Sequence, residues 1–171
     1  MKKILLTLAL MAGIGLTAQA QKFATVDMGY IMKNIPAFES ANEQLNQVSK
    51  KWQSEIDIQM KEVQQLYKNY QTELVFMRDE MKVKREEEIV TKEKAAQELK
   101  HKYFGPDGEL FKKRESLIKP IQDEVYEAIE DISKNKGLDL IFDKSSAMSA
   151  IFVSPKLDIS DEVLKKLGYS K

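Results

Sequence analysis

The chain has 171 residues, no cysteine, and 27 basic against 27 acidic side chains. Because its formal net charge is zero, no overall basic field attracts it to nucleic acid. Disulfides and a lipid-modified cysteine are excluded, so stability has to come from packing or assembly. Charged residues make up 32% of the chain and glycine is sparse, a composition typical of long helices rather than of a compact globule.

The first 20 residues have the pattern of a secretory signal. Lys2 and Lys3 precede an apolar run over 4–16, and the Ala-Gln-Ala at 18–20 places small residues where a signal peptidase cleaves. About 13 apolar residues fall short of the roughly 20 that span a bilayer, although a membrane anchor is the alternative. Cleavage would leave an exported chain that starts at Gln21 and has 25 basic residues (27 minus the two lysines) against 27 acidic.

The next segments predict a short strand followed by helices. Residues 23–27, Phe-Ala-Thr-Val-Asp, alternate between apolar and polar as a strand does. A short helical turn is expected over 30–34. Pro36 suits the first turn of a new helix, because its missing N–H would have no partner there.

A stripe of apolar residues predicts one long, straight helix after Pro36. A run of about 40 residues would be roughly 60 Å long. The stripe recurs at an average interval of about 3.6 residues, the period of an α-helix, and consists of Leu45, Val48, Trp52, Ile56, Met60, Val63, Tyr67, Tyr70, Leu74, Met77 and Met81.

The C-terminal third predicts a second helix, a strand pair and a small helix. Apolar residues from 117 to 132 recur with helical spacing, and the lysines before Gly137 are typical of a helix end. Two short apolar runs follow, "LDLIFD" at 138–143 and "AMSAIFV" at 147–153, and the short 144–146 segment between them indicates a tight connection. Ser160 is expected to cap a small helix over 161–167.

The position at which the helical segment reverses follows from equal arm lengths. If the strands at 23–27 and 138–143 belong to one body, the excursion starts near residue 36 and ends near residue 137, with its midpoint near 87. A reversal at Gly105–Gly108 would leave most of the longer arm unpaired, but it is the alternative. We therefore expect the tip between 76 and 90 and a kink or loop at 105–108.

The predicted fold class is α+β. Residues 21–36 and 137–171 would form a β-rich body, and residues 37–136 a long antiparallel helical hairpin inserted between the first and second strands. Three short strands and a small helix enclose little apolar volume, so we expect the sheet to be completed by other copies of the chain. The residues expected in this oligomeric body are Phe23, Val26, Leu140, Phe142 and Ile151.

These features together resemble the OmpH/Skp family of periplasmic chaperones over nearly all of the chain after residue 20. The features are the Ala-X-Ala signal, the strand "ATVDMGYIM", the Gln/Lys/Glu-rich hairpin, "LDLIFDKSS" and the terminal "DISDEVLKKLG". The resemblance implies a periplasmic homotrimer whose small β-barrel body is built by all three chains. Three helical hairpins would enclose a cavity that holds unfolded outer-membrane proteins.

The candidates for contact with such clients are Met60, Tyr67, Tyr70, Met77 and Met81. Methionine is flexible and polarizable, and tyrosine offers a ring with a polar end, so both accommodate varied partners. The same stripe could instead pack against the returning helix, and both interpretations could hold along different lengths.

The charge pattern departs from the family. The resemblance suggests basic hairpins that attract acidic clients and lipopolysaccharide or phospholipid headgroups, but residues 78–94 hold six basic and six acidic side chains. Long-range steering would be weak, so no lipopolysaccharide site is expected and only weak contact with a membrane surface is.

No pattern of catalytic or metal-binding residues occurs in the sequence. His101 is the only histidine, and the glycines at 105 and 108 lack the lysine and preceding strand of a phosphate-binding loop. We therefore expect no enzyme activity, no cofactor, no metal, no nucleic acid and no small-molecule substrate. The alternative function is a periplasmic coiled-coil adaptor that docks to a membrane complex.

Overall fold

The computed structural model describes residues 21–146 and 151–169. The predicted signal at 1–20 and the first residues of the expected strand at 147–153 lie outside the described residues. In chain order the elements are β1 (Phe23–Val26), α2 (Met28–Lys33), α3 (Pro36–Glu73), the 3₁₀ turn η1 (Leu74–Phe76), α4 (Asp79–Phe104), α5 (Glu109–Lys136), β2 (Leu140–Asp143), the 3₁₀ turn η2 (Pro155–Leu157) and α6 (Ser160–Lys166). The mostly helical fold with a long helical hairpin and a small sheet agrees with the α+β prediction.

The chain divides into two compact units. One, the hairpin unit, is Met32–Val125, and the other, the body unit, combines the residues up to Ile31 with those from Tyr126 onward.

The body unit contains two parallel strands. β1 pairs with β2 in the register Phe23 to Leu140 and Val26 to Asp143. Parallel neighbours require a long crossover, and the hairpin unit lies within that connection in the sequence. On the other side of β1, the Ile159 N–H donates to the Thr25 carbonyl at 2.9 Å.

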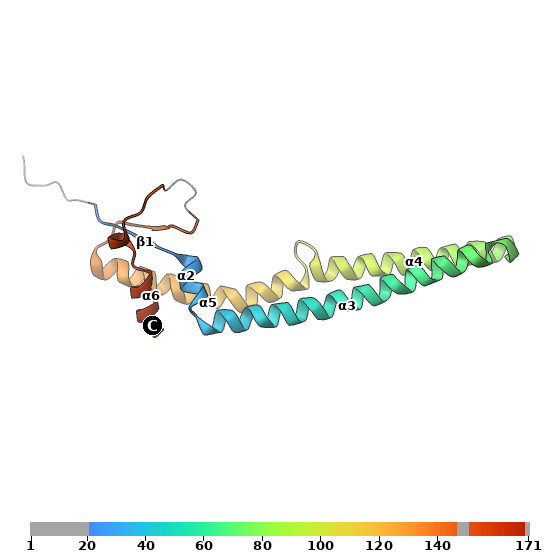
Figure 1. The fold of residues 1–171 in the computed structure, drawn as a ribbon, viewed down its shortest axis with the longest axis horizontal. Helices are drawn as coiled ribbons and strands as arrows, with labels where there is room; N and C mark the ends of the chain where they lie inside the picture. The colour runs from blue at the N-terminus through green and yellow to red at the C-terminus, as the bar shows by residue number, and fades with distance from the viewer. Residues whose placement is uncertain (1–20, 147–150, 170–171) are drawn as a thin grey trace, which may run out of the picture. The chain divides into compact units, whose positions relative to one another are not determined.

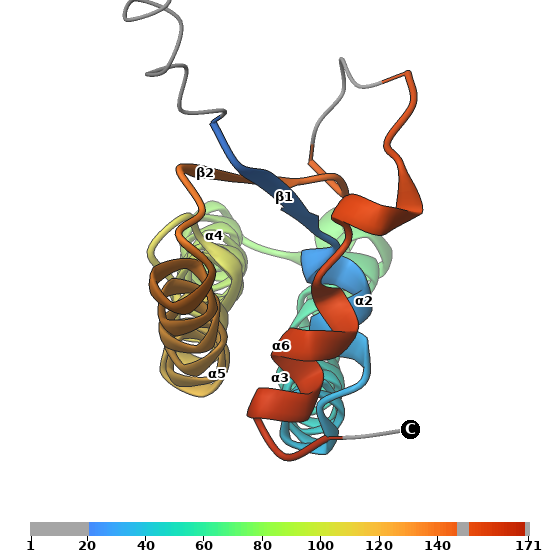
Figure 2. The same cartoon turned by 90° about the vertical axis from the view of Figure 1, so that its left-hand side faces the viewer.

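The core of the body unit is formed by one face of β1 and by the short helices. Ala24 and Val26 are buried, as are Ile31 of α2 and Val163 of α6. Figure 2 shows α6 next to α2, and the Tyr30 hydroxyl donates to Asp161 at 2.8 Å, which joins these two helices. The expected role of Ser160 is wrong in detail: α6 has no side-chain cap, because the Ser160 hydroxyl accepts a hydrogen bond from the Asp27 N–H instead.

The expected strand pair at 138–143 and 147–153 is not formed in the described residues. β2 pairs with β1, whereas Ile151, Phe152 and Val153 are not in a strand. The segment expected to connect the two strands instead bonds to β1 and β2. The Lys144 N–H donates to the Val26 carbonyl, and the Asp143 carboxylate accepts from Ser145. The backbone of this turn therefore extends the β1–β2 ladder.

The hairpin unit consists of α3, which forms the outgoing arm, and of α4 with the first part of α5, which form the returning arm. α3 begins at Pro36, as the sequence predicts. Figure 1 shows α4 running back along α3, and the two helices bury Ile56 and Ile89.

The long straight helix predicted through Met81 is wrong at its C-terminal end. α3 ends at Glu73, η1 covers Leu74–Phe76, and α4 begins at Asp79. Between them Met77 and Arg78 have extended backbone, with ψ of 139° and 156°, which reverses the chain. Neither glycine nor proline marks this reversal, and Met77 and Met81 continue the 3–4 spacing across it. The spacing alone therefore could not locate the end of the helix.

Candidate functional site

The apolar stripe of α3 changes character along its length. Leu45 and Ile56 are buried, whereas Met60 and Tyr67 nearer the reversal are exposed. One part of the stripe is therefore used for packing within the hairpin unit, and the part toward the reversal is accessible to a partner.

The five candidate contact residues lie on three segments. Met60, Tyr67 and Tyr70 are on α3, Met77 follows η1, and Met81 is in the first turn of α4. Met60, Tyr67 and Met81 are exposed, and Tyr70 and Met77 are half-buried. The Tyr70 hydroxyl donates to Glu86 of α4, and this bond raises the pKa of Tyr70. Tyr70 thus joins the two arms as well as presenting its ring.

The most exposed apolar side chains of the hairpin unit are at the reversal. Val75 and Phe76 are 86% and 87% exposed, and Leu74 beside them is also exposed. We call Leu74–Met77 the apolar tip. The helical spacing does not identify Val75 and Phe76, because they fall outside the 3–4 spacing of the stripe. The signal that could have found them is four consecutive apolar residues within an otherwise charged helix.

Aromatic and polar contacts connect the two arms. The rings of Trp52 on α3 and Tyr103 on α4 are stacked, with centroids 4.6 Å apart. The Tyr103 hydroxyl donates to Glu55 at 2.8 Å, which raises the pKa of Tyr103. Lys92 forms an ion pair with Glu62 at 2.7 Å. Exposed ion pairs contribute little, so buried apolar contacts and the ring stack are the main stabilising contacts between the arms.

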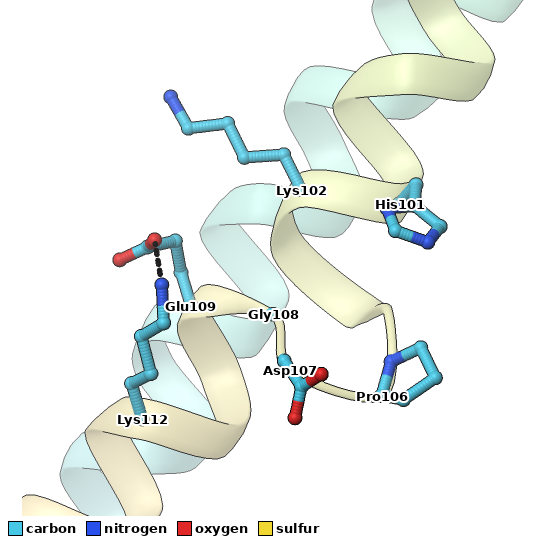
Figure 3. Close-up of a pocket in the computed structure, with 7 residues that line it drawn as sticks. All are labelled: His101, Lys102, Pro106, Asp107, Gly108, Glu109 and Lys112. Carbon is cyan, nitrogen blue, oxygen red and sulfur yellow. Dashed lines mark hydrogen bonds and ion pairs between the residues drawn. The ribbon is translucent and has the colours of Figure 1, made fainter.

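The Gly105–Gly108 segment lies between α4 and α5 (Figure 3). The Gly105 N–H donates to the His101 carbonyl at 2.8 Å, and the Gly108 N–H donates to the Gly105 carbonyl at 2.9 Å. A Cβ at Gly105 would lie 2.4 Å from the His101 carbonyl oxygen, and one at Gly108 would lie 2.8 Å from that of Tyr103. Both glycines are therefore required by close backbone contact.

The shallow cavity beside this loop carries charges of both signs. Lys112 Nζ lies 3.3 Å from Glu109 Oε1 (Figure 3), so the two charges largely neutralise each other. The cavity is lined by His101, Lys102, Pro106, Asp107, Gly108, Glu109 and Lys112. This arrangement of charges does not favour the binding of either an anion or a cation.

The body unit presents an apolar sheet face. Phe23, Leu140 and Phe142 are 43%, 46% and 50% exposed. Paired residues of a parallel sheet share a face and side chains alternate along a strand, so the register places all three on the same face. Of the other two residues predicted for the oligomeric body, Val26 lies on the opposite face and is buried, and Ile151 is fully exposed beyond β2.

A polar network lies at the C-terminal ends of the two strands. Lys144 Nζ is 2.6 Å from Asp158 Oδ2 and 3.7 Å from Asp27 Oδ2. Burial works to raise the pKa of Asp158, but hydrogen bonds from Lys144 and Ser160 outweigh it and hold this pKa below its ordinary value. Asp143 behaves similarly: hydrogen bonds from Ser145 and the Met28 N–H outweigh burial and lower its pKa. Through Lys144, the network connects the segment after β2 to Asp27 and to Asp158.

Within residues 21–146 and 151–169, no three His, Cys, Asp or Glu side chains are grouped so that they could bind a metal ion. Among the helices of these residues, none combines the length and apolar character that crossing a bilayer requires. The accessible features are therefore the exposed apolar surface of the hairpin unit and the apolar sheet face.

Comparison with known proteins identifies similar chains. Residues 22–167 match the model of the family described as outer membrane protein (OmpH-like), which confirms the resemblance inferred from the sequence. An uncharacterized protein of Aquifex aeolicus (strain VF5) is 28% identical over 98% of this chain and 96% of its own length. The fold is similar to a crystal structure of an OmpH-like outer membrane chaperone from Caulobacter crescentus CB15, with a TM-score of 0.67 and 11% identity, over 86% of this chain and 83% of that one.

Proposed function

Because the chain belongs to the family of OmpH-like outer membrane proteins, we propose that it is an ATP-independent holdase chaperone. It holds unfolded outer-membrane β-barrel proteins in the periplasm after removal of residues 1–20. The observation that carries this proposal is the accessible apolar surface of the hairpin unit, where methionine and tyrosine side chains are exposed among charged residues.

The chemistry of this surface suits an unfolded barrel protein. Such a client exposes alternating apolar residues and unpaired strand edges, which aggregate in water. Many weak contacts cover these segments without trapping any one of them. Met60, Tyr67 and Met81 provide adaptable contacts of this kind, with Tyr70 and Met77 beside them.

Three copies of the chain assemble through the body. The apolar sheet face of Phe23, Leu140 and Phe142 supports this part of the proposal, because an exposed apolar face on a small sheet is buried when copies associate. The body unit also exposes Ile151 and Phe152. In the trimer, residues 21–36 and 137–171 complete a small β-barrel, and three hairpins formed by residues 37–136 enclose the client.

The experiment uses residues 21–171 and a urea-unfolded outer-membrane barrel protein, whose aggregation on dilution is followed by light scattering. Stoichiometric suppression of scattering is expected. The double variant Tyr67→Ser/Met81→Ser should need a roughly 3- to 10-fold higher concentration, because apolar contact area is lost. The matched control is Gln64→Ser/Gln71→Ser, which changes exposed polar positions of α3. Unchanged aggregation with the unmodified chain would reject the proposal.

A further inference from the structure

We propose that Met60 and Met81 are sites of reversible oxidation to methionine sulfoxide, and that this modification weakens the hold of the hairpin unit on its client. The oxidant is a peroxide. The inference rests on the proposed function, because it concerns regulation of the same surface. It is carried by exposed thioether groups on the candidate client-contact surface of a chain that has no cysteine.

Methionine is the only sulfur-containing residue of this chain. It occurs eight times, and two of these, Met1 and Met11, belong to the segment whose removal is proposed. A cysteine thiolate would compete for the oxidant, but the sequence contains none. Peroxide therefore acts on the thioethers.

The methionines of the described residues differ in exposure. Met60 on α3 is 39% exposed, and Met81, which follows the apolar tip in the first turn of α4, is 54% exposed. Met32 in α2 is only 6% exposed, and Met28 and Met77 are half-buried. Because oxidation follows access to the sulfur atom, Met60 and Met81 react first and Met32 reacts last.

The modification is the transfer of one oxygen atom. A lone pair of the thioether sulfur attacks one oxygen of hydrogen peroxide, so that an S–O bond forms and the O–O bond breaks. The proton on the transferred oxygen moves to the leaving hydroxide, and the products are a sulfoxide and water. The sulfur loses two electrons, which the peroxide gains. A methionine sulfoxide reductase reverses the change by supplying two electrons and two protons and releasing the oxygen as water.

Oxidation alters the contact surface and leaves the hairpin folded. Ile56 and Ile89 are the buried apolar side chains that face each other on the two arms, and the ring stack between the arms involves neither methionine. A sulfoxide oxygen accepts hydrogen bonds from water, and an apolar client segment that covers it removes those bonds without replacing them. Client contacts at Met60 and Met81 therefore become weaker.

Peptide mass spectrometry of residues 21–171 treated with hydrogen peroxide tests the selectivity. Oxidation of Met60 and Met81 should be roughly 10-fold faster than oxidation of Met32, because the Met32 sulfur is shielded. In concentrated urea, which exposes every sulfur, the three rates should become similar. Oxidation of Met32 in the folded chain at the rate of Met60 and Met81 would overturn the inference.

Light scattering with a urea-unfolded outer-membrane barrel protein tests the consequence. Residual peroxide is removed before the client is added, so that only this chain carries sulfoxide. The quantity measured for each variant is the ratio of the concentrations that suppress scattering after and before oxidation. For the unmodified chain this ratio should be roughly 3 to 10. It should fall most of the way to one for Met60→Leu/Met81→Leu, and keep the unmodified value for the matched control Met28→Leu in the body unit.

The outcomes separate this inference from the proposed function. If the chain fails to suppress scattering before oxidation, both are rejected. If it suppresses scattering equally well before and after oxidation, or if the leucine pair responds as the unmodified chain does, only the inference is overturned. Methionine sulfoxide reductase should restore the original concentration dependence. Circular dichroism should be the same before and after oxidation, and a loss of helix would overturn the inference by showing that oxidation unfolds the hairpin.

Discussion

Tyr103 connects the two arms of the hairpin through both its ring and its hydroxyl. The ring stacks on Trp52 with an interplanar angle of 6°, and the hydroxyl donates to Glu55. The two contributions can be separated, because phenylalanine keeps the ring and removes only the hydroxyl. The pair also shows that the single tryptophan serves packing within the hairpin unit.

Tyr103→Phe should lower the free energy of unfolding slightly, because it removes one hydrogen bond and keeps the ring. Trp52→Ala should cost more, about 2–4 kcal/mol, because it removes apolar area as well as the stack. Urea unfolding followed by far-UV circular dichroism measures both. If Trp52→Ala were no more destabilising than Tyr103→Phe, the stack would not be a principal contact between the arms.

The carboxylates of Asp143 and Asp158 make the body sensitive to acid. Their pKa values are lowered in the folded chain, so they stabilise it at pH values above the unfolded pKa, about 3.9. This stabilisation decreases as the pH falls through that value toward the lower folded pKa. The thermal midpoint of the unmodified chain should therefore fall between pH 6 and pH 3, by about a few degrees.

Asp158→Asn tests the source of this pH dependence. The variant should melt lower than the unmodified chain at neutral pH, and the difference should shrink in acid, because the Lys144 ion pair is already lost there. Asp57→Asn, at an exposed position on α3, is the control. A constant difference between Asp158→Asn and the unmodified chain at all pH values would contradict the argument.

At the scale of elements, helix starts and stops follow from local chemistry only where a special residue marks them. Pro36 begins α3, and Gly137, with a φ of +62°, follows the last residue of α5. Both boundaries could be predicted from the sequence. No local residue marks the end of α3, because extended backbone at Met77 and Arg78 reverses the chain without glycine or proline. Equal arm lengths gave only the range 76–90 for the reversal.

The candidate contact surface could also be predicted only in part from the sequence. Helical spacing identified Met60 and Tyr67, which are exposed on α3, but it gave equal weight to Ile56, which is buried. Periodicity defines a face of a helix and does not show how far along its length that face is covered. Val75 and Phe76 could not be identified from the spacing, because exposure at a reversal depends on where the helix ends.

The loop between α4 and α5 gives a prediction at this scale. Gly105→Ala should destabilise the hairpin by about 1–3 kcal/mol, because its Cβ would overlap the His101 carbonyl oxygen and the backbone has to shift. Gly29→Ala is the matched control. Its Cβ would lie 3.4 Å from the nearest atom, within helix α2, so it should be neutral or stabilising by up to about 1 kcal/mol.

Thermal unfolding of the two alanine variants by circular dichroism distinguishes these outcomes. A Gly105→Ala variant as stable as Gly29→Ala would show that the loop tolerates a side chain, and hence that its tight backbone contacts are not required.

At the scale of the whole molecule, the decisive feature is a body too small to bury its own apolar residues. Within residues 21–146 and 151–169 its sheet has two strands, and Phe23, Leu140 and Phe142 remain exposed on one face. An exposed apolar face of this kind favours association with another surface. The proposed trimer supplies that surface from sister chains.

Leu140→Glu/Phe142→Glu should convert the assembly into single chains, because the carboxylates would have to be buried in the interface. Ile58→Glu introduces a charge at an exposed position of α3 and should leave the mass unchanged. Sedimentation equilibrium gives the mass of each variant. Association that survives the double substitution would place the interface elsewhere.

The most direct test of the central claim is native mass spectrometry of residues 21–171 mixed with a urea-diluted, unfolded outer-membrane protein. One dominant complex with three copies of this chain and one client is expected, and Leu140→Glu/Phe142→Glu should abolish it. A single copy of the chain that leaves the client to aggregate would contradict both the assembly and the chaperone function.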